Sequence, residues 1–304
     1  IGVEAATDLS RLKDQIPPFP KSQALKSLRE RGLSTIRGDL LLDRSFFEPV
    51  DHDPAKFDGE PLKAYNVGPD ALLLNFKALA LTFTPRNGQV WLQLEPPLAG
   101  LRWPAAVPLS AGPCNDWRAA LKADFSDPTQ LRFAGAYPAA CGEQTWPVAY
   151  AEPRSFAWRA VAGMWQQVGG TLHGQVREGK VPAGLTPAFE SRSPPLADIV
   201  RDINKFSNNV MAQQLFLTLA LAQRGLGTPD GAREVVRDWL ASRYGDIGRA
   251  AVIDNGSGLS RDARVSALLL ARLLQRHHRL ATRLGKPAQH EFLGKGRVQP
   301  IAPG

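Results

Sequence analysis

The sequence has little of what would place a chain in a membrane. No stretch approaches the ~20 consecutive apolar residues that a membrane-spanning helix needs. The longest apolar stretch, 210–222, is interrupted by Gln213 and Gln214. The chain begins at Ile1 and shows no signal peptide, so we expect that its N-terminus was processed or lies upstream of this sequence. We expect no transmembrane segment.

The sequence also lacks the basic clusters that are typical of nucleic-acid binding. The net charge is +8, yet Lys and Arg are not interleaved with aromatic residues in any one stretch, and we therefore expect no nucleic-acid partner. A basic surface would suit an anionic cell-wall polymer or the outer face of a membrane. A hydrophobic content of 43% over 304 residues is typical of a globular protein long enough for two domains.

Cysteine is scarce, with Cys114 and Cys141 as the whole complement. Both lie in loop-like surroundings rich in Pro, Ala and Gly, and neither has the neighbours expected of a nucleophile or a metal ligand. They fit one disulfide in an oxidising compartment or two unrelated thiols, and the residues alone leave both readings open.

The first two thirds of the chain are predicted to combine short helices with strands, and the texture is β from about 71 to 150. Local patterns indicate a short helix at 22–34, a strand at 35–43, a helix at 156–168 and a strand at 171–176. Between about 71 and 150 they indicate further strands at 72–76, 78–83, 90–94 and 131–135. The segment 85–88, Pro-Arg-Asn-Gly, predicts a hairpin turn between two of these strands.

The chain after Pro195 is predicted to be mostly helical. Ser193 is a candidate N-cap for a helix that carries Ile199, Ile203 and Phe206 on its apolar face. Further helices are expected at 210–223, 230–243 and 265–277, and a buried strand at 250–253.

Two short motifs in this helical part carry candidate chemistry. Ser207 and Asn209 form a Ser-x-Asn triplet at the junction of two expected helices, where a plain capping serine is the alternative reading. Downstream, 254–261 reads Asp-Asn-Gly-Ser-Gly-Leu-Ser-Arg, and glycines at 256 and 258 permit a tight turn with positive φ. An ordinary connection between a strand and a helix would explain this second motif equally.

Together the two motifs and their flanks (Asn204-Lys205 before the triplet, Met211-Ala212-Gln213-Gln214 after it) resemble a known family. It is the D-alanyl-D-alanine carboxypeptidase/endopeptidase family, the class C low-molecular-weight penicillin-binding proteins, which are serine peptidases. The resemblance covers about residues 22–276. It implies an α/β fold, with a serine β-lactamase/transpeptidase-like catalytic domain, here partial, and inserted β-rich domains.

The resemblance also implies a division of the chain. We expect an atypical N-terminal segment at 1–21, inserted α+β and β-rich domains at 22–190, the helical part of the catalytic domain at 191–278 and an atypical tail at 279–304. The family is periplasmic, which favours the disulfide reading of Cys114 and Cys141. Peptidoglycan peptides are the implied substrates and β-lactams the implied inhibitors, with no metal and no cofactor.

The family's acyl-transfer chemistry gives roles to three residues. A serine nucleophile attacks a D-alanyl carbonyl, a lysine one helical turn along takes its proton, a second serine carries the proton toward the leaving group, and an asparagine holds the substrate amide. By resemblance, Ser207 is the proton shuttle and Asn209 the substrate anchor. Arg261 would pair with a substrate carboxylate, and a solvated arginine is the alternative.

The other two motifs of the family are not found in context. Ser10 and Lys13 match Ser-x-x-Lys, but they lie too close to the strand at 38–40 and lack a small, apolar setting, so we expect a solvated polar turn. Lys-Thr-Gly is absent, and Gly294-Lys295-Gly296 does not replace it. The leading hypothesis is a D-Ala-D-Ala carboxypeptidase/endopeptidase that is incomplete in the chain as given. The alternative is a non-catalytic peptidoglycan-binding protein.

The loop that contains Asp51, His52, Asp53 and Asp58 is also a candidate metal-binding site. Carboxylates around a histidine are typical metal ligands. We interpret the segment as a polar loop, because its surroundings also resemble the family's inserted domain.

Overall fold

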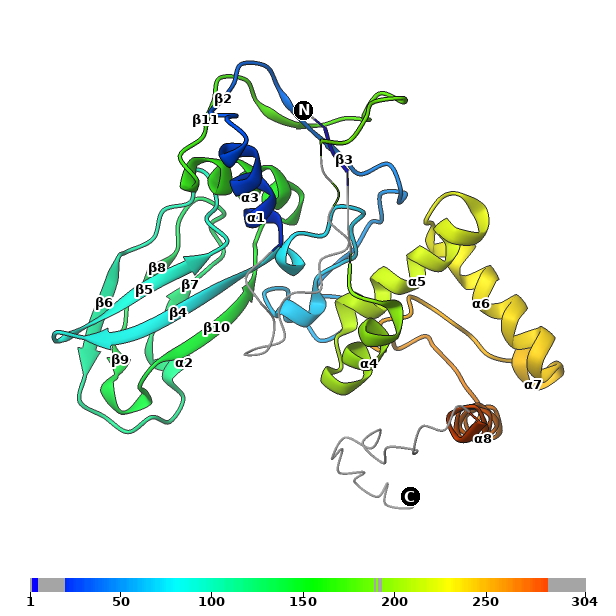
Figure 1. The fold of residues 1–304 in the computed structure, drawn as a ribbon. Helices are drawn as coiled ribbons and strands as arrows, with labels where there is room; N and C mark the ends of the chain where they lie inside the picture. Colours follow the sequence, from blue (N-terminus) through cyan, green and yellow to red (C-terminus); the bar gives the residue numbers. More distant parts are fainter. Residues whose placement is uncertain (1, 5–19, 189, 191–192, 284–304) are drawn as a thin grey trace. The chain divides into compact units, whose positions relative to one another are not determined.

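The computed structural model describes residues 2–4, 20–188, 190 and 193–283 (Figure 1). The chain forms two compact units, Ile1–Ser193 and Pro194–Gly304. The expectations for Ser10, for Lys13 and for the tail beyond 283 lie outside the described residues. Within the described ranges, no helix is both long and apolar enough to cross a bilayer.

The first unit combines a few helices with many short strands. Its helical elements are α1 (Pro20–Glu30), α2 (Trp117–Ala120), α3 (Pro153–Gln167) and the 3-10 turns η1 (Ala64–Asn66), η2 (Asn75–Lys77) and η3 (Ala139–Cys141). Its strands are β1 (Gly2–Glu4), β2 (Thr35–Ile36), β3 (Leu40–Asp43), β4 (Ala78–Arg86), β5 (Gln89–Glu95), β6 (Ala106–Ser110), β7 (Ala123–Asp124), β8 (Arg132–Phe133), β9 (Tyr137–Pro138), β10 (Gln144–Ala149), β11 (Thr171–Leu172) and β12 (Val176–Glu178).

A five-stranded sheet in the order β10-β4-β5-β6-β9 dominates this unit (Figure 1). Its centre is the hairpin β4–β5, and the two turn residues Asn87 and Gly88 have φ of 52° and 75°. Two successive positive φ values are the signature of a turn whose twist matches that of the flanking strands, and Asn-Gly is its favoured sequence. The hairpin predicted at 85–88 is therefore confirmed. The smaller sheets are β1-β3-β12, β11-β2 and β7-β8.

An aromatic cluster packs against the inner face of the large sheet. Phe83 of β4 is fully buried and lies 5.4 Å from Trp117 and 5.5 Å from Tyr137, measured between ring centroids. Such edge-to-face and offset pairs contribute beyond the area that they bury. A disulfide joins Cys114 to Cys141 beside this cluster. The structure therefore supports the disulfide reading of the two cysteines.

A buried cluster of charges supports the turn that leads into β4. The carboxylate of Asp70 accepts from Arg44 Nε at 2.8 Å and from Lys77 Nζ at 2.8 Å. The three residues of η2, Asn75 to Lys77, all have positive φ although none is glycine, which costs roughly 1–2 kcal/mol for each. Burial acts to raise the pKa of Asp70, but Lys77 and Arg44 outweigh it and hold that pKa below its ordinary value.

The second unit is helical. Its elements are α4 (Leu196–Phe206), α5 (Asn209–Arg224), α6 (Pro229–Tyr244), α7 (Asp246–Arg249) and α8 (Ala267–Arg283). Helix α5 ends at Gly225 with a φ of 80°, and the Thr228 hydroxyl caps α6 by accepting from Gly231 N at 2.9 Å. The helices predicted at 210–223 and 230–243 are confirmed, and α8 continues past its predicted end at 277.

Several local expectations are wrong. The strands predicted at 35–43 and 171–176 each divide between two sheets, as β2 and β3 and as β11 and β12. The apolar run 72–76 is no strand, because 72–74 form a buried loop and 75–76 belong to η2, where the Asp70–Lys77 pair closes the chain into a turn. The segment 250–253 forms one isolated bridge, from Val252 to Arg264, with Val252 exposed. Ser193 is not the N-cap of α4, since that position falls on Pro195.

We expect Asp70→Asn to lower the free energy of unfolding by about 3 kcal/mol, because it leaves the Lys77 ammonium buried without a counter-charge. The matched control is Asp39→Asn, which breaks an exposed pair with Arg177 and should change stability much less. Because the pKa of Asp70 is lowered in the folded state, its contribution is present above the unfolded pKa of about 4 and is lost as the pH falls further. Urea denaturation at pH 7 and at pH 3 measures both effects, and equal losses for the two variants would contradict the role of the buried pair.

Candidate active-site corner

The Ser-x-Asn triplet forms a sharp corner between α4 and α5. The backbone N–H groups of Ser207 and Asn208 both donate to the Ile203 carbonyl, which closes α4. The Asn208 side chain then accepts from Met211 N at 3.0 Å and caps α5. The capping residue is therefore Asn208, and the Ser207 side chain is left exposed to solvent at the corner.

Ser207 holds an unfavourable backbone conformation. Its φ of 53° and ψ of 48° are left-handed, a region that costs a residue other than glycine roughly 1–2 kcal/mol. Glycine is the usual residue at this position after a helix. Because strained positions cluster at functional sites, this conformation makes Ser207 a candidate functional residue.

The glycine-rich segment 254–261 folds into a compact turn. The Asn255 side chain accepts from Ser257 N at 3.0 Å and from Ser257 Oγ at 2.7 Å. Ser257 is buried, and its Oγ accepts from Leu259 N at 2.9 Å. At Gly256, where φ is 70°, an added Cβ would lie 2.7 Å from the Phe216 ring of α5. The absence of a side chain therefore lets the turn lie against α5.

One hydrogen bond joins the two motifs. Asn209 Nδ2 donates to the Ser257 carbonyl at 2.8 Å, across 48 positions of sequence. A carbonyl can only accept, so the amide must present its nitrogen to the turn and its Oδ1 away from it. The corner and the turn thus form one polar cluster, with Asn209 half-buried between them.

The side chains at the junction of the two motifs supply hydrogen bonds and no base. The side chains of Ser207, Asn208, Asn209 and Ser257 are all neutral at pH 7. Arg261 follows the turn and is exposed, and its own carbonyl accepts from Arg264 Nη1 at 2.7 Å. Its role toward a substrate carboxylate stays a prediction. Chemically, this arrangement can orient a polar ligand and pass a proton through a hydroxyl.

Sequence reasoning missed the supporting residues of the cluster. Ser257 provides the carbonyl that fixes Asn209, and Phe216 provides the surface against which Gly256 packs. Gln213 and Gln214, which belong to the flank of the triplet, are buried on α5 although both are polar.

The loop around His52 is held by internal hydrogen bonds. His52 Nε2 lies 2.6 Å from the Asn66 carbonyl, and Asp58 accepts from Tyr65 at 2.8 Å and from Asn66 at 2.7 Å. In the part of the chain that the structure describes, no group of three or more His, Cys, Asp or Glu side chains could hold a metal ion.

Comparison with solved structures identifies the fold. Penicillin binding protein 4 from Haemophilus influenzae superposes with a TM-score of 0.64 at 19% identity, over 87% of this chain and 59% of that one. The same protein complexed with a novel β-lactam gives a TM-score of 0.57 at 16% identity, over 90% of this chain and 58% of that one. The chain therefore has a mixed α/β fold of the penicillin-binding, transpeptidase-like kind, as the resemblance implied, and spans somewhat more than half the length of these structures.

The family itself follows from its sequence model. The model of the D-Ala-D-Ala carboxypeptidase 3 (S13) family matches residues 19–287, which is most of the chain. The chain belongs to this family, as the resemblance predicted.

We expect Gly256→Ala to destabilise the second unit by about 2 kcal/mol or more, since its Cβ would overlap the Phe216 ring in addition to the positive-φ strain. Gly258→Ala is the matched control. Its φ is 80°, but its Cβ would meet only Asn209 Nδ2 at 3.8 Å, so strain alone should cost about 1 kcal/mol. Hydrogen exchange of peptides from α5 and from 250–264 measures the difference, and equal protection in the two variants would contradict the packing argument.

We also expect Ser207→Gly to stabilise the corner by about 1 kcal/mol, because glycine adopts the left-handed conformation without a steric cost. Ser207→Ala keeps the Cβ and should leave stability almost unchanged at this exposed position. Melting temperatures of the three proteins test this, and a glycine variant that melts below the alanine variant would show that the corner is unstrained.

Proposed function

We propose that this protein is a serine-type D-Ala-D-Ala carboxypeptidase and endopeptidase that acts on peptidoglycan peptides through an acyl-enzyme. Two findings support the proposal. The chain belongs to the D-Ala-D-Ala carboxypeptidase 3 (S13) family. The observation that carries it is the hydrogen bond from Asn209 to Ser257, which builds one polar corner from the two motifs.

The reaction would proceed in two steps. A serine Oγ attacks the carbonyl of the penultimate D-alanine, an ester forms, and the peptide C–N bond breaks to release the terminal D-alanine with its nitrogen protonated. Water then hydrolyses the ester and restores the serine. In an endopeptidase reaction, the leaving amine belongs to a neighbouring peptide instead. A β-lactam would enter the first step and leave a penicilloyl ester.

Ser207 and Asn209 would serve the first step. The exposed hydroxyl of Ser207 can accept a proton on one side while it donates one on the other, which suits a shuttle to the leaving nitrogen. Asn209 has one amide hydrogen committed to the Ser257 carbonyl. Its Oδ1 and its second amide hydrogen would bind the substrate amide. The hydrogen bond to the Ser257 carbonyl would hold the Asn209 side chain in the orientation that this binding requires. Arg261 would attract the terminal carboxylate.

The disulfide supports a periplasmic location. Disulfides form and persist in oxidising compartments, and the pair Cys114–Cys141 closes a separation of 27 residues. The positive net charge of +8 would favour contact with an anionic cell-wall polymer.

A second candidate is a non-catalytic peptidoglycan-binding protein. It is favoured by one observation: within the described residues, no serine is followed by lysine at the third position after it. Such a protein would retain the polar corner for binding and would form no ester.

We expect the protein, expressed with the whole reading frame that contains this sequence, to acquire the mass of one penicilloyl group on incubation with benzylpenicillin. Ser207→Ala should slow this acylation by about 10²-fold or more, because the proton path to the leaving nitrogen is lost. Ser242→Ala is the control, since Ser242 is an exposed serine on α6 whose Oγ donates to the Trp239 carbonyl. Intact mass followed by peptide mapping gives the rate and the modified serine.

The outcomes separate the two candidates. Saturable binding to purified peptidoglycan without any covalent adduct would favour the binding protein. An adduct that forms equally fast in the Ser207 and Ser242 variants would contradict the shuttle role of Ser207 while leaving the acyl-enzyme in place.

A further inference from the structure

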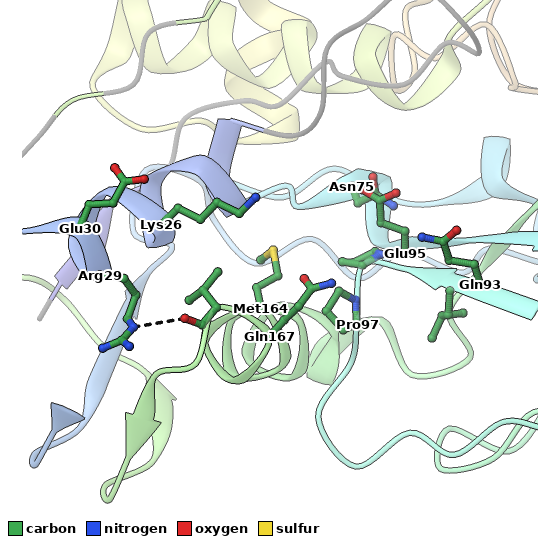
Figure 2. A pocket seen from close by; sticks show the side chains of 12 residues that line it. Lys26, Arg29, Glu30, Asn75, Gln93, Glu95, Pro97, Met164 and Gln167 are labelled. Atoms are coloured by element: carbon green, nitrogen blue, oxygen red, sulfur yellow. Dashed lines mark hydrogen bonds between the residues drawn. The ribbon is translucent and has the colours of Figure 1, made fainter. Parts of the chain in front are cut away.

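The first unit contains a polar pocket of about 570 Å³ that the proposed reaction does not use (Figure 2). Its volume lies in the range of ligand-binding pockets. Helix α1, turn η2, strand β5 and helix α3 each contribute to its wall. The residues that the argument uses are Lys26, Arg29, Asn75, Gln93, Glu95 and Gln167.

Close backbone contacts form the walls of this pocket. Gly163 of α3 has no room for a side chain, since a Cβ there would lie 2.3 Å from the Pro97 carbonyl. On the other side, Arg29 of α1 donates through Nε to the Val168 carbonyl at the end of α3, at 3.2 Å (Figure 2). Asn75 belongs to the left-handed turn η2, and its Nδ2 donates to the Ala78 carbonyl at 2.8 Å. The pocket is therefore a formed feature of the unit.

The lining combines amide side chains with charged side chains of both signs, Lys26 and Arg29 beside Glu30 and Glu95, whose charges cancel. Lys26 extends its ammonium from α1 across the pocket toward the side that carries Asn75 and Glu95 (Figure 2). Arg29 is committed to the Val168 and Leu33 carbonyls, and Glu95 also has an interaction within the structure. The amides of Gln93 and Gln167 each present both donors and an acceptor. Such a lining matches a ligand that carries hydroxyl and amide groups and no strong charge.

Two residues of the lining, Gln93 and Glu95, share one face of β5 with residues outside the pocket. Side chains alternate on a strand, so Gln89, Trp91, Gln93 and Glu95 point to the same side. Trp91 is 38% exposed, and the Arg86 guanidinium lies over its indole at 4.9 Å from the ring centroid. About 13 Å of extended strand separate Trp91 from Glu95 in the pocket.

The neighbouring strands extend this outer face with small hydroxyl side chains. Thr84 of β4 is paired with Trp91, and Thr82 with Gln93. Thr82 Oγ1 lies 3.3 Å from Thr145 Oγ1 of β10. An exposed indole beside threonine and glutamine side chains combines a flat apolar surface with hydrogen-bonding groups.

We propose that the pocket and the stripe Trp91–Gln93–Glu95 bind an oligosaccharide of N-acetylated sugars, that is, a segment of a glycan strand. The sugar's flat apolar face would lie on the Trp91 indole, and its hydroxyl and acetamido groups would bond to Gln93, Gln167 and Lys26. The choice of a glycan as occupant rests on the proposed function, because peptidoglycan peptides are carried on such strands. The first unit would then bind the glycan strand whose peptides are the substrates of the proposed reaction.

The test is a titration of the whole chain with chitotetraose, the β-1,4-linked tetramer of N-acetylglucosamine, followed by ¹H–¹⁵N NMR. We expect saturable shifts of the Trp91 indole N–H and of the Gln93 side-chain amide, identified by their loss in Trp91→Ala and Gln93→Ala. Each variant should weaken binding by about fivefold or more. Both side chains lie on the exposed face of the sheet, and unchanged amide spectra elsewhere would show that the variants are folded.

Trp239→Ala is the matched control, because Trp239 is 43% exposed and lies 5.9 Å from the Arg243 guanidinium, but belongs to the second unit. It should bind the sugar as the unmodified chain does. Absence of saturable shifts, or equal affinity in all three variants, would overturn the proposal. Shifts of Gln93 with the dipeptide D-Ala-D-Ala and none with the sugar would also overturn it, in favour of a peptide site. The sugar titration does not depend on acylation by penicillin. A failure of the glycan site can therefore be told apart from a failure of the proposed acyl-enzyme.

Discussion

The hydrogen bond from Asn209 to the Ser257 carbonyl is the contact on which the candidate site depends. Without it, the triplet is a capping corner and 254–261 is a connecting turn. This hydrogen bond can form only because two other residues make room for it. Asn208 must take over the capping of α5, so that Asn209 is left to turn toward Ser257. Gly256 must allow the turn to approach Phe216. The bond therefore fixes the orientation of the Asn209 amide at the corner.

The first unit shows a comparable dependence on a buried ion pair. Asp70 and Lys77 hold three successive residues in left-handed conformations, and this turn delivers the chain into β4 with Asn75 facing the pocket. The energy for strained backbone comes from contacts that are formed only in the folded state. Both units therefore use buried polar contacts to fix a particular backbone geometry.

The sequence predicted those features whose determinants are local. The hairpin followed from Asn87-Gly88, and the helices from their apolar period and their ends at glycine. The family followed from two short motifs. The failures have a common physical cause. The apolar run 72–76 is buried, but burial alone does not distinguish a strand from a loop, and the deciding contact joins Asp70 to Lys77. The bond that unites the site spans 48 positions and leaves no trace in either motif. Ser193 failed as a cap because Pro194 and Pro195 lie between it and the first helical residue.

The disulfide makes the two units differ in their sensitivity to redox conditions. The chain between Cys114 and Cys141 carries Trp117, Phe125, Phe133 and Tyr137, which are most of the aromatic cluster. Reduction would enlarge the unfolded ensemble of this segment and weaken the first unit. The second unit contains no cysteine. Synthesis in a reducing host would therefore weaken the β-rich first unit and leave the folding of the helical second unit unaffected.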